Sequence, residues 1–144
     1  MTTIPEQAVR LSAGPSLEHE ISRLSELLVD RSGSGTWWAA MAQRVESLSR
    51  SLWEDRGADG IHVDITSDEP RLVPAVRRLE QEHDVITTEI AGLRALISRH
   101  AGDRGAVALV VARSTEVIAM IRAHQRRTRD AVHEAWSVDL GGGE

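Results

Sequence analysis

Residues 72–100 read LVPAVRRLEQEHDVITTEIAGLRALISRH, and this stretch decides the fold. Its apolar side chains recur at alternating intervals of four and three residues, with one histidine inside the series. The positions of the series are Leu72, Val76, Leu79, His83, Ile86, Ile90, Leu93 and Ile97. Such spacing puts all of these side chains on one face of an α-helix, so we predict a helix that packs into a bundle.

Three further segments have the same rhythm and are separated by turn-forming residues. We predict helices at 16–30, 36–64, 72–100 and 104–138, because the loops between them carry Gly, Pro and Ser. The inward series of the other three helices begin with Leu17, Ile21, Leu24 and Leu28; with Trp38, Met41, Val45, Leu48 and Leu52; and with Val110, Ser114, Val117, Ile121 and His124. Short connections between long helices favour an all-α, up-down antiparallel four-helix bundle without a sheet.

The composition limits the class of protein. The chain has 144 residues, no cysteine and a net charge of −5. We expect one bundle domain at 16–139, an N-terminal extension at 1–15 and a disordered tail at 140–144. The absent cysteines favour a cytoplasmic location, and no apolar run approaches the ~20 residues of a membrane span. The negative charge argues against a nucleic-acid partner.

The tandem Trp37-Trp38 cannot bury both rings on one helix face, so one ring is free to cover a homodimer contact or a ligand pocket.

Two histidines occupy positions where a bundle needs leucine. His83 and His124 both lie about six helical turns from the loop near Gly102, so they are expected at the same height. Two imidazoles that meet in a core suit iron, zinc or copper. The alternative is that each ring only makes a hydrogen bond to a core neighbour.

A weak internal repeat indicates a second polar layer. In both copies, residues 53–62 and 124–133, an aspartate follows the first position by six residues and a histidine follows it by nine. The residues concerned are Asp59, His62, Asp130, His133 and the adjacent Glu134. They are candidates for a metal or substrate site, or else they cap and pair at a solvated helix end.

Three short runs together resemble a known family. They are Leu17-Glu-His19-Glu-Ile21, the run LEQEHDVI at 79–86, and Ile121-Arg-Ala-His124. Over residues 15–139 the chain resembles the hemerythrin-like (HHE cation-binding) domains, and residues 124–142 are similar to a divergent actinobacterial-type branch of them. The resemblance implies a four-helix bundle with a histidine on each helix. It also implies non-haem iron that serves to bind or sense oxygen, to store iron, or to act on peroxides and nitric oxide.

The chain departs from the family pattern at several ligand positions. Trp53 stands in place of the histidine of the second helix, with Gly57 four residues later, and Thr128 follows His124 where the fourth helix would supply a carboxylate. Both bridging carboxylates are therefore missing. We predict at most one tightly held metal, with Trp53 filling core space beside His83 and His124. At ~100° per residue, His19 falls opposite the apolar series of its helix, which favours a surface position.

Three functions follow from these residues. The first is a bundle that binds a non-haem metal, with iron expected and two ions, one or none left open, to sense or handle oxygen or a related small oxidant. In that function His83 and His124 are the leading ligands and His19, Asp59, His62, Asp130, His133 and Glu134 are the further candidates. The second is a metal-free bundle that acts as a binding or interaction module. The third is a small non-haem metal-dependent oxygenase-type enzyme.

Overall fold

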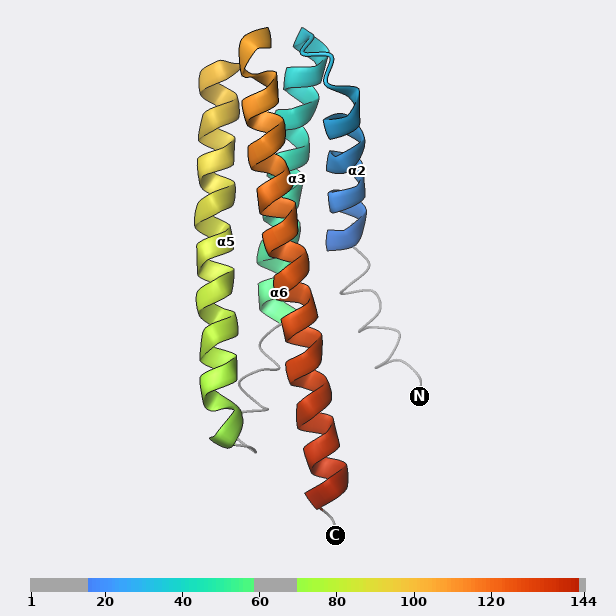
Figure 1. Ribbon diagram of the computed structural model, residues 1–144, viewed down its shortest axis with the longest axis vertical. Helices are drawn as coiled ribbons and strands as arrows, with labels where there is room; N and C mark the ends of the chain where they lie inside the picture. Colours follow the sequence, from blue (N-terminus) through green and yellow to red (C-terminus); the bar gives the residue numbers. More distant parts are fainter. Residues whose placement is uncertain (1–15, 59–69, 143–144) are drawn as a thin grey trace.

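The computed structural model describes residues 16–58 and 70–142, and at 55–58 and 135–142 it describes the backbone alone. These residues form the helices α2 (Leu17–Asp30), α3 (Gly35–Ala58), α5 (Val73–His100) and α6 (Val107–Gly142) and the 3₁₀ turns η1 (Pro70–Leu72) and η2 (Arg104–Ala106). No strand occurs among them, so the prediction of an all-helical bundle is confirmed for this part of the chain (Figure 1).

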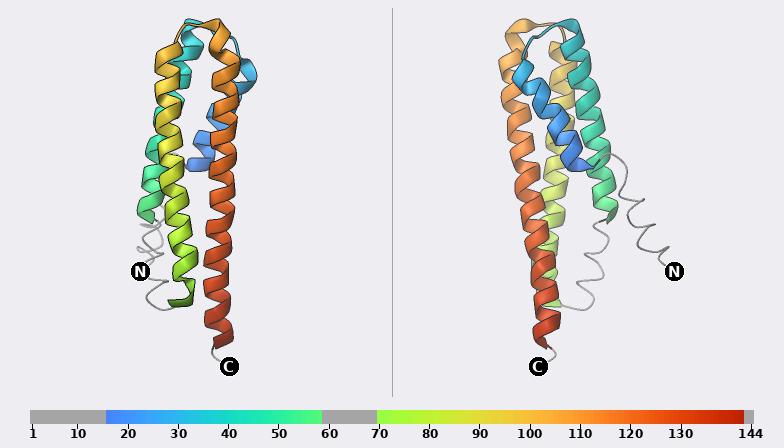
Figure 2. Two further views of the ribbon diagram at one scale, coloured as in Figure 1. Left: turned by 60° about the vertical axis from the view of Figure 1, so that its left-hand side comes forward. Right: turned by 90° about the vertical axis from the view of Figure 1, so that its right-hand side faces the viewer.

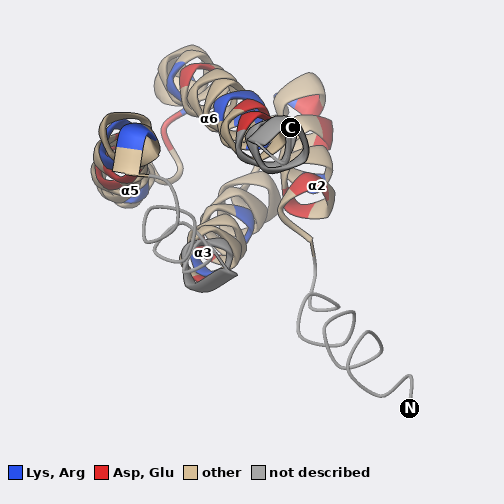
Figure 3. Ribbon diagram, turned by 90° about the horizontal axis from the view of Figure 1, so that it is seen from below, with Lys and Arg blue, Asp and Glu red and all other residues tan. Residues whose placement is uncertain are grey.

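The four helices lie around a common core in the order α2, α3, α5, α6. Contacts join each helix to the next, and the α2–α6 contact that closes the ring is the least extensive. Figure 3 shows this ring from below, and Figure 2 shows the helices side by side in two further views. α2 has 14 residues and accompanies only the upper part of the 36-residue α6 in Figure 1. The core is therefore four helices wide at the top and narrower below.

Side-chain caps fix where three of these elements begin. Ser16 Oγ accepts a hydrogen bond of 3.1 Å from the His19 amide at the start of α2. Asp103 Oδ1 accepts one of 2.9 Å from the Gly105 amide ahead of α6. For α3 the cap is Ser34, whose Oγ accepts a hydrogen bond from the Trp37 amide at 3.2 Å. Each cap satisfies an amide that the first helical turn leaves without a partner.

The apolar series found in the sequence form the core. The predicted inward positions of α2, α3 and α5 from 17 to 52 and from 72 to 97 are all buried, as are Val110, Val117 and Ile121 of α6. The predicted ends differ from the observed ones. α6 continues to Gly142 instead of ending at 138, and residues 59–64, predicted as helix, lie outside the described residues. Within the described part of the chain, no helix has the length and apolar character that crossing a membrane requires.

Both rings of the tandem tryptophan are buried, which corrects the prediction that one would remain outside. Trp37 is 2% exposed and Trp38 is 3% exposed. Trp37 lies under the end of α2 and donates its Nε1–H to the Leu27 carbonyl at 2.9 Å, whereas the buried Nε1 of Trp38 has no partner in the described part of the chain. The rings pack edge to face, with centroids 5.0 Å apart. Because α2 covers the flank of α3, two adjacent residues both find a core contact.

Candidate functional site

The two core histidines meet between α5 and α6. His83 and His124 are each 2% exposed, their ring centroids are 5.9 Å apart, and the rings are inclined by 68°. The prediction that His83 is buried and contacts His124 is confirmed. His83 lies on the apolar face of α5 between Leu79 and Ile86, and His124 follows Ile121 on the apolar face of α6, so helical periodicity alone turns both rings inward.

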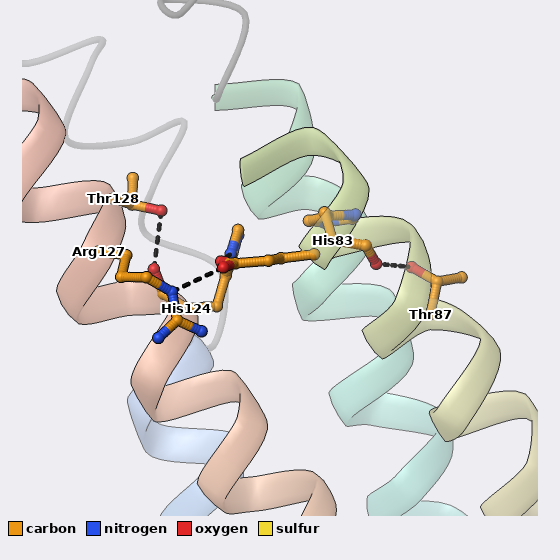
Figure 4. Close-up of polar contacts among 6 residues, drawn as sticks. His83, Thr87, His124, Arg127 and Thr128 are labelled. Carbon is orange, nitrogen blue, oxygen red and sulfur yellow. Dashed lines mark hydrogen bonds and ion pairs between the residues drawn. The ribbon is translucent and has the colours of Figure 1, made fainter. Parts of the chain in front are cut away.

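The backbone carbonyls of the two histidines accept the same kind of hydrogen bond. The hydroxyl of Thr87 donates to the His83 carbonyl at 2.9 Å, and the hydroxyl of Thr128 donates to the His124 carbonyl at 2.9 Å (Figure 4). Each threonine stands four residues after its histidine, where a hydroxyl can reach back to the carbonyl of the preceding turn. The hydroxyl of Thr128, which stands where the family pattern has a carboxylate, thus donates its proton within α6.

One nitrogen of each ring is fixed by an outer hydrogen bond. His83 Nε2 lies 3.1 Å from the carbonyl oxygen of Leu52 on α3. Because a carbonyl only accepts, Nε2 carries the proton and donates it. His124 Nδ1 lies 3.0 Å from Glu82 Oε1, and an ionised carboxylate likewise only accepts, so Nδ1 of His124 is the donor. In their neutral forms, the two rings therefore have opposite tautomers.

The other nitrogen of each ring has no partner. His83 Nδ1 and His124 Nε2 are both buried and make no hydrogen bond among the residues that the structure describes. In the tautomers just derived, each of these nitrogens bears a lone pair. A buried acceptor without a donor is energetically costly, and native proteins leave few of them. The pair thus offers two basic nitrogens to a group that accepts electron pairs.

Glu82 connects the buried pair to the surface. Its Oε1 accepts from His124, and its Oε2 accepts from Arg127 Nε at 2.7 Å. The His124 side chain is 3% exposed, Glu82 is 22% exposed, and Arg127 is 51% exposed, so the chain of contacts runs from core to solvent. The guanidinium holds Glu82 in the orientation that fixes the His124 tautomer.

Glu20 is a buried acidic residue that the sequence analysis did not select. It is 3% exposed on the inner face of α2, and its Oε1 is buried without a hydrogen-bond partner in the described part of the chain. Its spacing to Leu17 and Leu24, three and four residues, is the signal that could have found it. Acidic residues are common in the first turn of a helix because they interact favourably with the helix dipole. The presence of Glu20 there therefore gave no reason to expect a buried side chain.

The remaining predicted ligands do not join the histidine pair. His19, Asp130, His133 and Glu134 are all exposed. His19 is thus at the surface, as its angle on the helix predicted. The described residues of the second polar layer, Asp130, His133 and Glu134, face solvent. Asp59 and His62 lie outside the described residues. Among the side chains that are described, no three of His, Asp and Glu are arranged to hold a metal ion.

Trp53 does not occupy a ligand position in the core, and the prediction that it does was wrong. Its side chain is 64% exposed, whereas the adjacent Leu52 is 2% exposed and supplies the carbonyl bound by His83. The internal repeat placed the alignment one residue too late, and ~100° of rotation per residue then turns the side chain outward. On the α3 side, the residue that contacts the histidine pair is therefore Leu52.

Comparisons of the chain with protein-family models, with curated proteins and with solved structures each gave no match. The resemblance to hemerythrin-like domains therefore stays a prediction from the residues of this chain.

Proposed function

We propose that the bundle is a hemerythrin-like domain that binds one transition-metal ion through His83 Nδ1 and His124 Nε2. The observation that carries the proposal is the pair of outer hydrogen bonds, from His83 to the Leu52 carbonyl and from His124 to Glu82. Metal-binding histidines donate their second ring N–H in this way to a carbonyl or a carboxylate, which fixes the tautomer and raises ligand basicity.

The separation of the rings supports a shared ligand. Two imidazoles that bind one ion through nitrogen bonds of ~2.1 Å have centroids on the order of 5–6 Å apart. The observed separation is 5.9 Å. The up-down antiparallel arrangement of the family is supported by the alternating direction of successive helices in Figure 1 and by the short connections after Asp30 and His100.

Iron is the metal that this donor set favours. Two imidazoles and one carboxylate are the protein ligands of many non-haem Fe(II) sites. Glu20 is the buried carboxylate of α2 whose Oε1 lacks a partner, and it is our candidate for the third ligand, although the three side chains are not grouped around a common point and Glu20 would have to move toward the histidines to bind the same ion. Such a metal, with coordination positions left open, would supply reversible binding or reduction of oxygen or of a related small oxidant. The apolar side chains above the pair would limit the access of water.

A metal-free binding module is the second candidate. Its support is that no three metal-ligating side chains are grouped among the described residues. In this function the histidine pair would be a polar core contact, and binding would take place on the helix surfaces.

Metal analysis of purified variants separates the two candidates. The protein is expressed with iron supplied, reconstituted with Fe(II) without oxygen, desalted, and measured by elemental mass spectrometry. We expect one iron per wild-type chain, and its loss in His83→Leu with His124→Leu. The matched control His19→Gln, which changes an exposed histidine, should retain the iron. An iron-free wild-type protein, or a double variant that keeps its metal, would contradict metal binding at this pair.

A further inference from the structure

A groove of about 460 Å³ lies between α5 and α6, next to the Glu82–Arg127 ion pair. Its apolar lining comes from Val85 and Ile86 of α5 and from Ala119, Met120 and Ala123 of α6. The two alanines leave the α6 side shallow, and Val85 is 51% exposed. An aliphatic side chain this open has apolar surface to bury, which gives an apolar ligand a driving force.

One end of the groove carries the charged side chains. Arg78 and Arg127 line this end together with Glu82. Arg127 pairs with Glu82, whereas Arg78 makes no hydrogen bond or ion pair within residues 16–58 and 70–142. Glu89 on α5 and Glu116 on α6 lie one helical turn beyond the apolar lining and are not part of it, and Glu116 pairs with Arg113. A ligand with one negative end would therefore be oriented by attraction to the Arg78 end.

The length of the apolar lining selects the size of the occupant. On α6 it runs from Ala119 to Ala123, roughly 6 Å at 1.5 Å per residue, and on α5 it consists of Val85 and Ile86. A partner helix bound in a groove needs anchors over at least two turns, so this groove is too short for one. A short acyl chain that ends in a carboxylate matches the apolar length, the basic end and the volume.

We propose that the groove between α5 and α6 binds a small amphipathic carboxylate, with the acyl chain on Val85 and Met120 and the carboxylate on Arg78 and Arg127. Arginine suits this role because its planar guanidinium can donate two parallel hydrogen bonds to a carboxylate. The binding does not depend on the proposed metal, since none of these residues is among its ligands.

Binding in this groove reaches His124 through Glu82. Arg127 donates to Glu82 Oε2, and Glu82 Oε1 accepts from His124 Nδ1. A bound carboxylate competes with Glu82 for the same guanidinium. Glu82 then interacts more strongly with its remaining donor, the imidazole N–H, so a ligand at the surface alters the electronic state of the buried ring.

Octanoate is the probe for this proposal, used with the metal-free full-length protein. Calorimetric titration and ¹H–¹⁵N correlation spectra should show binding, with shifts centred on Val85 and Met120 and a shift of the His124 Nδ1 resonance. Acetate, which lacks the chain, and octan-1-ol, which lacks the charge, should each bind at least about tenfold more weakly. Octylammonium should not bind, because its charge is of the same sign as that of the arginines.

Two variants locate the binding. Arg78→Gln should raise the octanoate Kd about three- to tenfold, as expected for loss of a partly exposed charge contact. Ala119→Leu adds bulk to the α6 side and should abolish binding. Arg99→Gln, at the far end of α5, is the matched control and should leave the Kd unchanged. Circular dichroism checks that all three variants fold. Equal binding of octanoate and octan-1-ol, shifts elsewhere on the bundle, or an unchanged Kd in Ala119→Leu would overturn the proposal.

Discussion

The upper core around Trp37 and the histidine layer around His83 and His124 are formed by the same helices. They differ in which of their buried polar atoms lack a hydrogen-bond partner. In the upper core, Trp37 donates its indole N–H to Leu27 and four helices close around apolar side chains. In the histidine layer, one ring nitrogen each of His83 and His124 is buried without a partner. The upper core also leaves one buried polar atom without a partner, the indole Nε1–H of Trp38. That N–H can only donate a hydrogen bond, whereas the imidazole nitrogens can bind a group that accepts electron pairs.

The largest expected effect comes from removing a ring of the upper core. Trp37→Ala deletes a side chain that is 2% exposed, so unfolding in urea should show a loss of about 3–5 kcal/mol from the cavity and the lost contacts. Trp53→Ala changes the same residue type where it is 64% exposed, and should cost under about 1 kcal/mol. Equal losses in the two variants would show that the two tryptophans are not divided between core and surface.

The next effect concerns the outer support of the histidine layer. Glu82→Ala leaves the buried His124 Nδ1–H without an acceptor and should lower the free energy of unfolding by about 1–3 kcal/mol. Glu116→Ala removes the exposed pair with Arg113, in which N and O are 3.5 Å apart, and should cost no more than about 0.5 kcal/mol. Denaturant titration of both variants tests this ranking, and a Glu82→Ala protein as stable as the control would contradict it.

A third substitution should act in the opposite direction. Glu20→Leu replaces a buried carboxylate that lacks a partner at Oε1, and should stabilise the metal-free protein by about 1–2 kcal/mol. Glu18→Leu, two residues earlier on the exposed side, loses its contact with Arg122 and should bring no gain. Thermal unfolding of both metal-free variants gives the comparison. Destabilisation by Glu20→Leu would mean that the carboxylate already has a stabilising role in the metal-free state.

The fold and the centre of the site could be predicted from periodicity. Alternating intervals of three and four residues placed the helices, and counting turns from Gly102 placed His83 and His124 at one height. The features that could not be predicted are of two kinds. Some depend on which face of a helix a single residue occupies, and others depend on contacts with a neighbouring helix. Trp53 was assigned to the core from a repeat alignment that was one residue out, and its side chain is exposed.

Two other errors have similar causes. Glu20 was missed because a first-turn acid already has a local explanation, and only the packing of α2 reveals that its side chain is buried. The burial of Trp37 depends on the end of α2 lying over the flank of α3, which no pattern within α3 records. The hydrogen bonds from His83 to the Leu52 carbonyl and from His124 to Glu82 join residues 31 and 42 positions apart, so neither is visible in a local motif.

If the histidine pair can bind a metal as proposed, His83 Nδ1 and His124 Nε2 carry free lone pairs in the metal-free protein. Long-range ¹H–¹⁵N spectra of protein labelled at histidine measure this directly, with His83→Gln and His124→Gln used for assignment. In the metal-free protein we expect a proton on Nε2 of His83 and on Nδ1 of His124. Added Zn²⁺, a diamagnetic probe, should shift the other nitrogen of each ring and leave His19 unchanged. The opposite tautomers, or Zn²⁺ shifts confined to other histidines, would rule out metal binding by this pair of nitrogens.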